Sequence, residues 1–462
     1  MLTLSHSGIT SLPATGACRR PYRATVAYLC LVSIAILLWF PEPLSLPGGM
    51  SPVTIVMAFS LFFAVRGARS RTQCLLDGGA SRYVAVTLTC SGFILFWSNL
   101  SVLDAPEPLR AGRVIVSHFC GVAIFVMLYA TFTIQRARAL IRITLLMAAF
   151  VSTLSLLAYF NSTLFELLFA DRDRSNGFFK HSNQYGMVLS TVAPVGLALA
   201  LSARARLAWL AIVGAIVFGF VAAGSKTNLL IFSSSTTFML LFAPLLERNP
   251  AARIISFSRN LVFGVSVAIL GGIGLTTFNP RAVRILAQFF YDDDEVRSLL
   301  SRRELWDFSV EQVFKHPFLG QGAGQMIPTN YGDGLVPHSH NIIIDYMRML
   351  GIPGLALCLI FMLATIFALA TTIRLAYLAR CARYEHRLIT VGLAVGGLSY
   401  IAANMSSDSF GPSTSPFFWL VTYLTLFMRA VLAREQAASM AQGGRLYCRQ
   451  TQHNAFARDN SS

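Results

Sequence analysis

Long apolar segments recur along almost the whole chain, and they constrain its fold more than any other feature of the sequence. A helix needs about 20 mostly apolar residues to cross the hydrocarbon core of a bilayer. Twelve segments are of this kind: 24–40, 51–65, 83–103, 114–134, 139–159, 185–202, 207–223, 229–246, 261–278, 342–370, 388–405 and 417–433. They are continuously apolar rather than alternating, which favours helices over a transmembrane barrel. We therefore predict an all-α, polytopic membrane protein with about 12 transmembrane helices.

The composition agrees with a chain that lies largely in lipid. Of its 462 residues, 55% are hydrophobic and only 13% are charged, whereas soluble domains carry about 25% charged residues. The net charge of +16 would suit a nucleic-acid partner, but basic residues of membrane proteins usually gather in cytoplasmic loops. We predict membrane lipid, and no nucleic acid, among the partners.

The arginines indicate how the chain crosses the membrane. They cluster in alternate connections, at 66–82, 136–142, 204–206, 248–259, 374–387 and 429–434, while 41–50 and 406–416 contain no Arg or Lys. The positive-inside rule therefore predicts a bacterial inner-membrane protein with both termini in the cytoplasm. The first span ends at Trp39, Phe40 and Pro41 without a small-residue cleavage site, so we predict that it is retained.

This orientation divides the chain into five parts. They are a cytoplasmic N-terminus (1–23), transmembrane helices 1–9 (24–278), a large periplasmic loop (279–341), transmembrane helices 10–12 (342–433) and a cytoplasmic tail (434–462), predicted to be disordered from about residue 436. The eight cysteines include no CxxC pair, and all fall in spans or on the cytoplasmic side. Neither a structural zinc site nor a disulfide is therefore predicted.

The loop at 279–341 is the longest polar stretch, and loops of this length are usually functional or disordered. Within it we predict an amphipathic helix that lies on the membrane surface or covers a cavity. Its apolar stripe consists of Leu305, Trp306, Phe308, Val310, Val313 and Phe314. Pro317 should end this helix, and the glycine-rich residues 320–324 should form a flexible turn.

Four short motifs follow one another in and after this loop. The first is Arg302 with Trp306 four residues later, and the second is His316-Pro-Phe-Leu-Gly320-Gln-Gly322. The third is His340-Asn341, and the fourth is Gly351-Ile-Pro-Gly354. In their order and spacing they resemble the O-antigen ligase and O-antigen or exopolysaccharide polymerase superfamily. Segments 176–186 and 224–227 also fit, so the resemblance extends over roughly residues 170 to 415.

The resemblance implies a metal-independent transferase that needs no cofactor and makes residues 279–341 a catalytic loop. It would move a glycan from undecaprenyl diphosphate to an acceptor hydroxyl on the periplasmic face. A leaving diphosphate develops negative charge that fixed cations must stabilise, and Arg302 and Lys226 are the candidates. His340 would accept the proton of the hydroxyl. The substrate-binding candidates are Lys180, His181, Asn183, Arg303, His338 and Asn341.

Each candidate also has a structural interpretation. One of the two adjacent arginines, Arg303 by the spacing to Trp306, could simply face solvent, and the two histidines could be ordinary loop residues. Asn341 could cap the following helix. Lys180, His181 and Asn183 could form a polar helix start. Lys226 stands in Gly-Ser-Lys-Thr, where many family members have Arg, and the remainder of a nucleotide-binding P-loop is missing around it.

Two acidic segments could also contribute to a site. Asp292, Asp293 and Asp294 could bind Mg²⁺, but they fall on the predicted outer side, and we interpret them as a solvated acidic run. Asp408, in the last predicted outer loop, could reach the cavity that the 279–341 loop is predicted to cover, although its spacing gives no indication of this. We therefore predict no metal site.

A polymerase and a ligase would use the same donor and differ in the acceptor. A polymerase adds the glycan to another lipid-linked glycan, and a ligase adds it to lipid A core; the 180–183 and 224–227 segments look closer to exopolysaccharide polymerases. A lipid-linked glycan transporter is the alternative from another class. Transporters often show two similar halves with ionisable residues at the midplane, whereas here cations concentrate in one outer loop, which favours an enzyme.

Overall fold

The computed structural model describes residues 21–41, 56–57, 59–61, 64, 78–102, 108–169, 174–202, 206–247, 249–278, 293–322, 324–329, 334–336, 338–406, 410–411 and 413–459. Its helices are α1 (Pro21–Leu37), α3 (Gly78–Val102), α4 (Pro108–Thr131), α5 (Ile134–Leu157), α6 (Ser162–Leu168), α7 (Ser182–Ser202), α8 (Arg206–Ala223), α9 (Lys226–Phe242), α10 (Pro250–Phe278), α12 (Asp293–Lys315), α13 (Ile342–Leu378), α14 (Tyr384–Asn404) and α15 (Ser415–Asp459). Two 3-10 turns, η1 (Ala158–Phe160) and η2 (Ala243–Leu246), extend α5 and α9. The strands β1 (Ile327–Pro328) and β2 (Leu335–Val336) pair antiparallel, with Ile327 opposite Val336.

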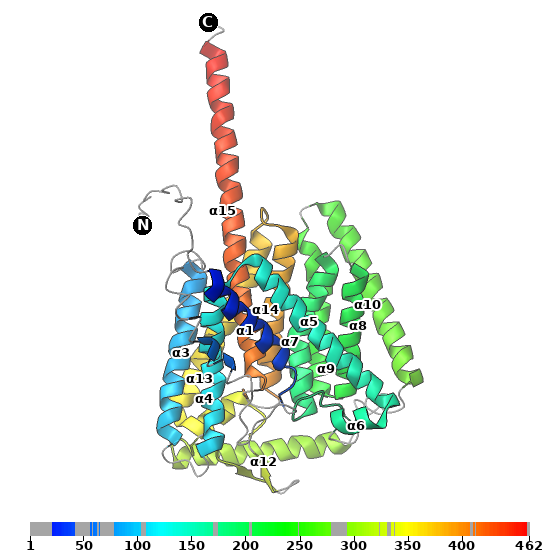
Figure 1. The fold of residues 1–462 in the computed structure, drawn as a ribbon, viewed down its shortest axis with the longest axis vertical. Helices are drawn as coiled ribbons and strands as arrows, with labels where there is room; N and C mark the ends of the chain where they lie inside the picture. Colours follow the sequence, from blue (N-terminus) through cyan, green and yellow to red (C-terminus); the bar gives the residue numbers. More distant parts are fainter. Residues whose placement is uncertain are drawn as a thin grey trace.

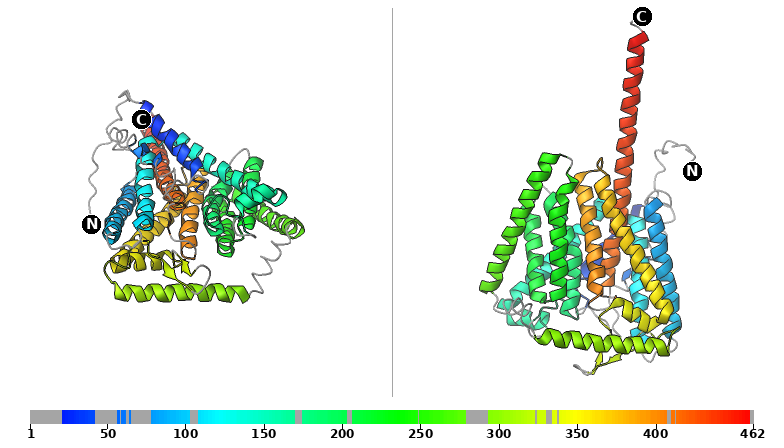
Figure 2. Two further views of the ribbon diagram at one scale, coloured as in Figure 1. Left: turned by 60° about the horizontal axis from the view of Figure 1, so that its bottom comes forward. Right: turned by 180° about the vertical axis from the view of Figure 1, so that it is seen from behind.

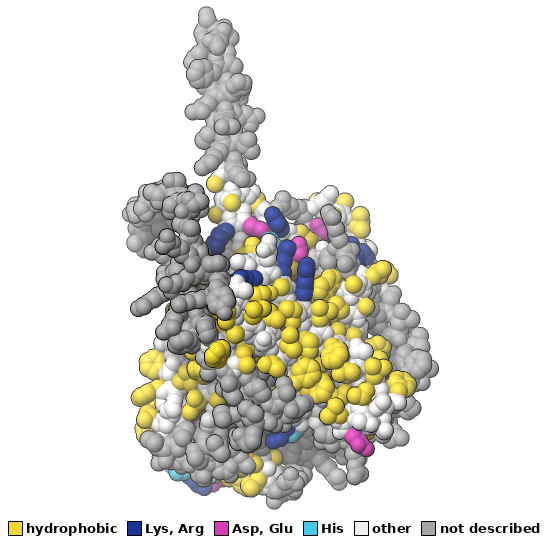
Figure 3. Space-filling model, in the orientation of Figure 1, with side chains coloured by type: hydrophobic (Ala, Val, Ile, Leu, Met, Phe, Trp, Pro, Cys, Tyr) yellow, Lys and Arg dark blue, Asp and Glu magenta, His cyan; other side chains and the backbone are white. Residues whose placement is uncertain are grey.

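The helices stand side by side in one bundle, as the apolar segments predict (Figure 1). Among the described residues, nine helices are long and apolar enough to cross a membrane: α3, α4, α5, α7, α8, α9 with η2, α13, α14 and α15. Hydrophobic side chains cover the middle of the visible face, and Lys and Arg side chains gather above it (Figure 3). The chain is therefore a helical multi-pass membrane protein. The predicted span at 51–65 lies mostly outside the described residues, so the count of about twelve stays a prediction.

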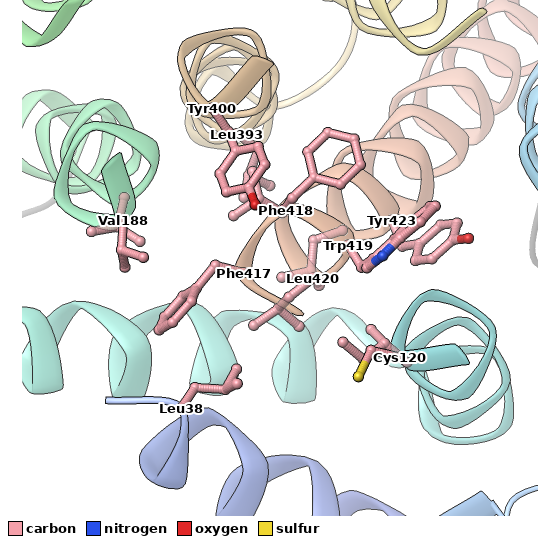
Figure 4. Packing of buried hydrophobic residues seen from close by; sticks show 14 of the residues in the cluster. Leu38, Cys120, Val188, Leu393, Tyr400, Phe417, Phe418, Trp419, Leu420 and Tyr423 are labelled. Atoms are coloured by element: carbon pink, nitrogen blue, oxygen red, sulfur yellow. The ribbon is translucent and has the colours of Figure 1, made fainter. Parts of the chain in front are cut away.

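The first turns of α15 form the centre of the bundle. Phe417, Phe418 and Trp419 are fully buried and point toward several neighbouring helices (Figure 4). The Trp419 indole N–H donates to Ser117 O on α4 (2.9 Å), and its ring lies against Gly121. A methyl group at Gly121 would overlap this ring, so the small residue permits the close approach of the two helices.

Helix α12 does not follow the bundle axis. Helix α12 lies across one end of the bundle, opposite the end from which α15 projects (Figures 1 and 2). This confirms a helix within the predicted loop. The expected single apolar stripe is wrong, however, because Leu305 and Val313 are buried whereas Phe314 is 83% exposed. At 100° per residue, Phe314 lies on the far side of the helix from Leu305.

The C-terminal segment also differs from expectation. Helix α15 continues to Asp459, past residue 436, where we expected the chain to become irregular. Its sequence there is rich in Ala, Gln and Arg, all good helix formers. A helix already started by the buried residues of α15 can propagate through such a segment, because only nucleation is unfavourable.

Candidate active site at the α12 end of the bundle

The beginnings of α7 and α9 are held together by amide side chains. Asn228 Nδ2 donates to Asn183 O (3.0 Å) and to Ser225 Oγ (2.8 Å). Arg174 donates from Nη2 to Asn183 Oδ1 (2.8 Å) and from Nε to Ala223 O (3.1 Å). These bonds join the predicted segments 176–186 and 224–227, which are far apart in sequence, and give Asn183 a structural role.

The glycine-rich turn after α12 packs onto a kink in α13. Gly351 has φ 68° and ψ −162°, so α13 consists of two helical pieces that meet there. The Ile352 N–H donates to Pro317 O (2.8 Å), and the Gln321 N–H donates to Arg348 O (2.8 Å). A Cβ on Gly320 would lie 2.5 Å from Arg348 O, and one on Gly351 would lie 2.5 Å from Pro317 O. The glycines of the second and fourth motifs therefore permit one close backbone contact, and the turn expected to be flexible is packed.

The histidine segment is fixed between α12 and α13. The Trp306 indole N–H donates to Ser339 O (2.8 Å), which explains why the first motif requires a Trp one turn after the Arg. His340 has φ 58°, a conformation that costs a residue other than Gly about 1–2 kcal/mol. The rings of His338 and His340 meet edge to face, with centroids 4.5 Å apart. The loop thus presents two imidazoles side by side.

Asn341 caps α13, as one of the two interpretations predicts. Its Oδ1 accepts the N–H groups of Ile343 (3.0 Å) and Ile344 (3.3 Å). Its Nδ2 donates to Met405 O at the end of α14 (3.2 Å). Both polar atoms of the side chain are therefore engaged in holding the loop against the bundle.

All the segments that carry sequence-predicted residues meet at this one end. Asn341 joins α13 to the end of α14, and Asn404 Nδ2 contacts Met187 Sδ near the start of α7 (3.1 Å). Asn228 then joins α7 to α9. This continuous series of contacts places Lys180, His181, Asn183, Lys226, His338, His340 and Asn341 around the end that α12 crosses. Residues from three separate segments therefore lie at the same end of the bundle.

The register of α12 separates Arg302 from Arg303. Arg302 lies on the same face as the buried Leu305 and Ser309, and its side chain is partly buried. Arg303 is on the opposite face, 78% exposed, where its Nε lies 3.8 Å from Asp307 Oδ2. Desolvation lowers the pKa of the Arg302 guanidinium, which still leaves it charged at neutral pH. The structure gives Arg302 no ion-pair partner among the residues it describes.

The remaining cations occupy helix starts. Lys226 is the first residue of α9, after Ser225 and after Gly224 with φ 57°. Lys180 is exposed and His181 partly buried, just before α7, where His181 O accepts the Gln184 N–H (3.0 Å). Helix N-termini carry a partial positive charge that favours anions. Both segments are therefore suited to a negatively charged group.

The acidic residues that could have bound a metal ion lie partly outside the described chain. Asp292 and Asp408 lie outside the described residues, and α12 begins at Asp293. Within the described part of the chain, no group of three or more His, Cys, Asp or Glu side chains is placed to hold a metal ion. A cavity of about 360 Å³ lies at the other end of the bundle, beside Glu247, Arg383 and Arg387.

Sequence reasoning missed a group of residues that shape the site. Asp345 and Arg348 lie in the first turns of α13, both with side chains 0% exposed, and Arg348 Nη2 is 3.6 Å from Asp345 Oδ1. Two opposite charges three residues apart at the start of an apolar span were the available signal. Arg174 and Asn228 had no comparable signal, because their partners come from distant segments.

The arrangement combines a partly buried guanidinium with no ion-pair partner in the described part of the chain, two imidazoles and two helix N-termini at one end of the bundle. Such a set can hold an anionic group and exchange a proton with a hydroxyl. The class defined by the fold is therefore a multi-pass membrane protein, with the candidate site at one end of its helices.

The family follows from comparison with known proteins. The sequence model of the family described as O-Antigen ligase matches residues 189–359. This segment of the chain is an O-antigen ligase family domain, carried by a multi-pass membrane protein. The match confirms the resemblance over a shorter range than the expected 170 to 415, and it contains Lys226, Arg302 and His340. No curated protein matches the chain.

Proposed function

We propose that the protein is a metal-independent glycosyltransferase that polymerises polysaccharide repeat units, as O-antigen or exopolysaccharide, on the periplasmic face of the inner membrane. Its donor is a glycan on undecaprenyl diphosphate, and its acceptor is another lipid-linked glycan. The observation that carries the proposal is the register of α12. Arg302 is partly buried, one turn before Trp306, which contacts the histidine segment, whereas Arg303 is exposed on the opposite face.

The reaction exchanges one bond at the anomeric carbon for another. The acceptor oxygen forms a bond to this carbon as its proton passes to His340, and the bond to the diphosphate oxygen breaks with the electron pair leaving on the diphosphate. Arg302 and Lys226 stabilise the charge that develops on this leaving group. Lys180, His181, Asn183, His338 and Asn341 are the proposed contacts to substrate, and the side chains of Asn183 and Asn341 also form hydrogen bonds within the protein. Arg303, on the exposed face of α12, is not among these proposed contacts.

Purified protein in bilayers, supplied with an undecaprenyl-linked oligosaccharide, tests the activity. Product of increasing glycan length with the lipid-linked acceptor is the expected result, and product only with lipid A core would make the protein a ligase. Movement of donor across the bilayer without any transfer would favour the transporter alternative. The reaction should continue in excess chelator; a strict requirement for a divalent ion would overturn metal independence and direct attention to the acidic run that begins at Asp292.

The proposed orientation has its own test. Single cysteines at positions 300 and 335 should react with an impermeant reagent from the periplasm, whereas cysteines at positions 70 and 380 should react only from the cytoplasm. These positions sample the α12 end and two arginine-rich connections. Reaction of position 300 only from the cytoplasm would exclude the proposed donor, because the site would face the wrong compartment.

A further inference from the structure

Two fully buried charges lie directly beneath the histidine segment. Asp345 and Arg348 both have side chains that are 0% exposed, at the start of a mostly apolar helix. A buried ion pair seldom adds net stability, because both ions lose their hydration. A charged pair in such a place can instead fix the conformation of the segments that it contacts. The contacts of Asp345 and Arg348 identify these segments.

Asp345 holds the peptide between the two histidines. Its Oδ1 accepts the Ser339 N–H (2.8 Å), and Trp306 donates to Ser339 O from the other side. Asp345 Oδ2 is also buried, and it has no hydrogen-bond partner among the described residues. A strained backbone conformation such as that of His340 persists only where surrounding contacts determine it.

Arg348 connects this carboxylate to the second loop. Its Nη1 donates to Gln325 O (2.8 Å), and its own carbonyl accepts the Gln321 N–H (2.8 Å). The pair therefore contacts the glycine-rich turn on one side and the histidine segment on the other. Both loops come from the same 279–341 segment, and the buried charges at the start of α13 contact both of them.

We propose that Asp345 and Arg348 are positioning residues, which hold the His338–His340 segment in the geometry required for proton transfer from the acceptor. This inference rests on the proposed function. Asp345 exchanges no proton with substrate; its charge-assisted bond to Ser339 fixes the loop, and Arg348 fixes Asp345. Small misplacements of a reacting group cost up to about 10²-fold in rate.

The test compares single and paired substitutions. Asp345→Asn and Arg348→Gln each leave one buried charge without its partner, so both should lower thermal stability. The double variant Asp345→Asn/Arg348→Gln is neutral and should recover much of the stability. If the pair positions the loop, kcat of the double variant should stay about 10- to 100-fold below that of the unsubstituted protein, with KM for the lipid donor little changed. Recovery of kcat together with stability would show a merely structural role and overturn the inference.

A matched control lies one residue away. Tyr346 is equally buried, and its hydroxyl is 2.6 Å from His118 Nε2, away from the histidine segment. Tyr346→Phe should therefore lower stability without the loss of kcat. An equal loss of kcat in this variant would mean that any change in the first turns of α13 disturbs the site, which would overturn the specific assignment to Asp345 and Arg348.

A second measurement needs no substrate. Diethylpyrocarbonate modifies accessible imidazoles, and peptide mass spectrometry reports the rates at His338 and His340 separately. In the folded double variant both rates should rise several-fold, because the loop is released; unchanged rates would overturn the inference. If instead the unsubstituted protein forms no transfer product while the modification rates rise as expected, the proposed function fails and the positioning of the loop stands.

Discussion

The two ends of the helix bundle both carry charged and imidazole side chains, but they use them differently. At the end away from α12, Arg138 Nη2 pairs with Glu385 Oε2 (2.9 Å) and His386 Nδ1 pairs with Glu435 Oε1 (2.8 Å). The buried Arg387 donates to Ala376 O and to Leu246 O (2.6 and 2.8 Å). These groups join the start of α14 to α5, α13, η2 and α15, and each has a carboxylate or carbonyl partner within the protein.

At the α12 end, the buried Asp345–Arg348 pair is matched in the same way, whereas Arg302 has no ion-pair partner among the described residues. A guanidinium that is partly buried without a counter-charge is suited to an anionic ligand. Net basic charge alone would not distinguish the two ends. What distinguishes them is whether each cation has a partner among the described residues, and this difference can be tested one residue at a time.

The largest expected effect comes from comparing one histidine at each end. His340→Ala should lower the transfer rate about 10²- to 10⁴-fold, the usual contribution of a general base. Donor binding should remain, because the imidazole acts on the acceptor hydroxyl. His386→Ala, which removes the contact with Glu435, should reduce stability and leave the rate per folded molecule unchanged. Initial rates and donor binding in detergent-purified protein measure both; full activity of His340→Ala would refute its role as the base.

The next effect separates the two adjacent arginines. Arg302→Ala should lower the rate about 10²- to 10³-fold, because a group that stabilises the developing charge is removed, and should also weaken donor binding. Arg302→Lys should recover only part of the rate, since an ammonium lacks the planar two-donor fork. Arg303→Ala, on the exposed face of α12, is the matched control, with a change of about twofold or less. The reverse result would place the essential residue one position later.

A third effect concerns the loop contact rather than its charges. Gly351→Ala should destabilise the protein by at least about 1–2 kcal/mol, because φ 68° is unfavourable for Ala and the added Cβ would meet Pro317 O. Gly214→Ala in α8 is the control, since nothing lies within 4 Å of the added Cβ and Ala is the better helix former. Thermal unfolding in the same detergent compares them. Equal stability of the two variants would show that the contact between turn and kink is not required.

The smallest effect is expected at the ion pair away from the site. Glu385→Gln removes one partner of Arg138, and both side chains are partly solvated. Such pairs contribute about 0–1 kcal/mol, so thermal stability should change little and the transfer rate should not change. A large loss of activity from this substitution would mean that the two ends are coupled, and that charge pairing does not distinguish a structural end from a functional one.

Several features of the site could be predicted from sequence because they depend on neighbouring residues. The spacing of Arg302 to Trp306 predicts that both lie on one side of a helix, and Trp306 does contact the histidine segment. Asn341 before an apolar run predicts a helix cap, which is confirmed. The apolar stripe of α12 was predicted wrongly. Sequence could not tell which face the bundle would cover, and the buried face includes Ser309 and Gln312 as well as Leu305.

The sequence by itself determined the helical, membrane-spanning class, since long apolar helices satisfy the backbone in lipid, and it predicted which motifs would carry the chemistry. The tertiary structure decided which residues from distant segments lie next to each other. It brought Asn183 to Asn228 and Ser339 to Asp345, and it turned Arg302 inward and Arg303 outward. The physical reason is that such contacts join residues far apart in the chain, and each depends on helix register and packing, which local composition does not encode.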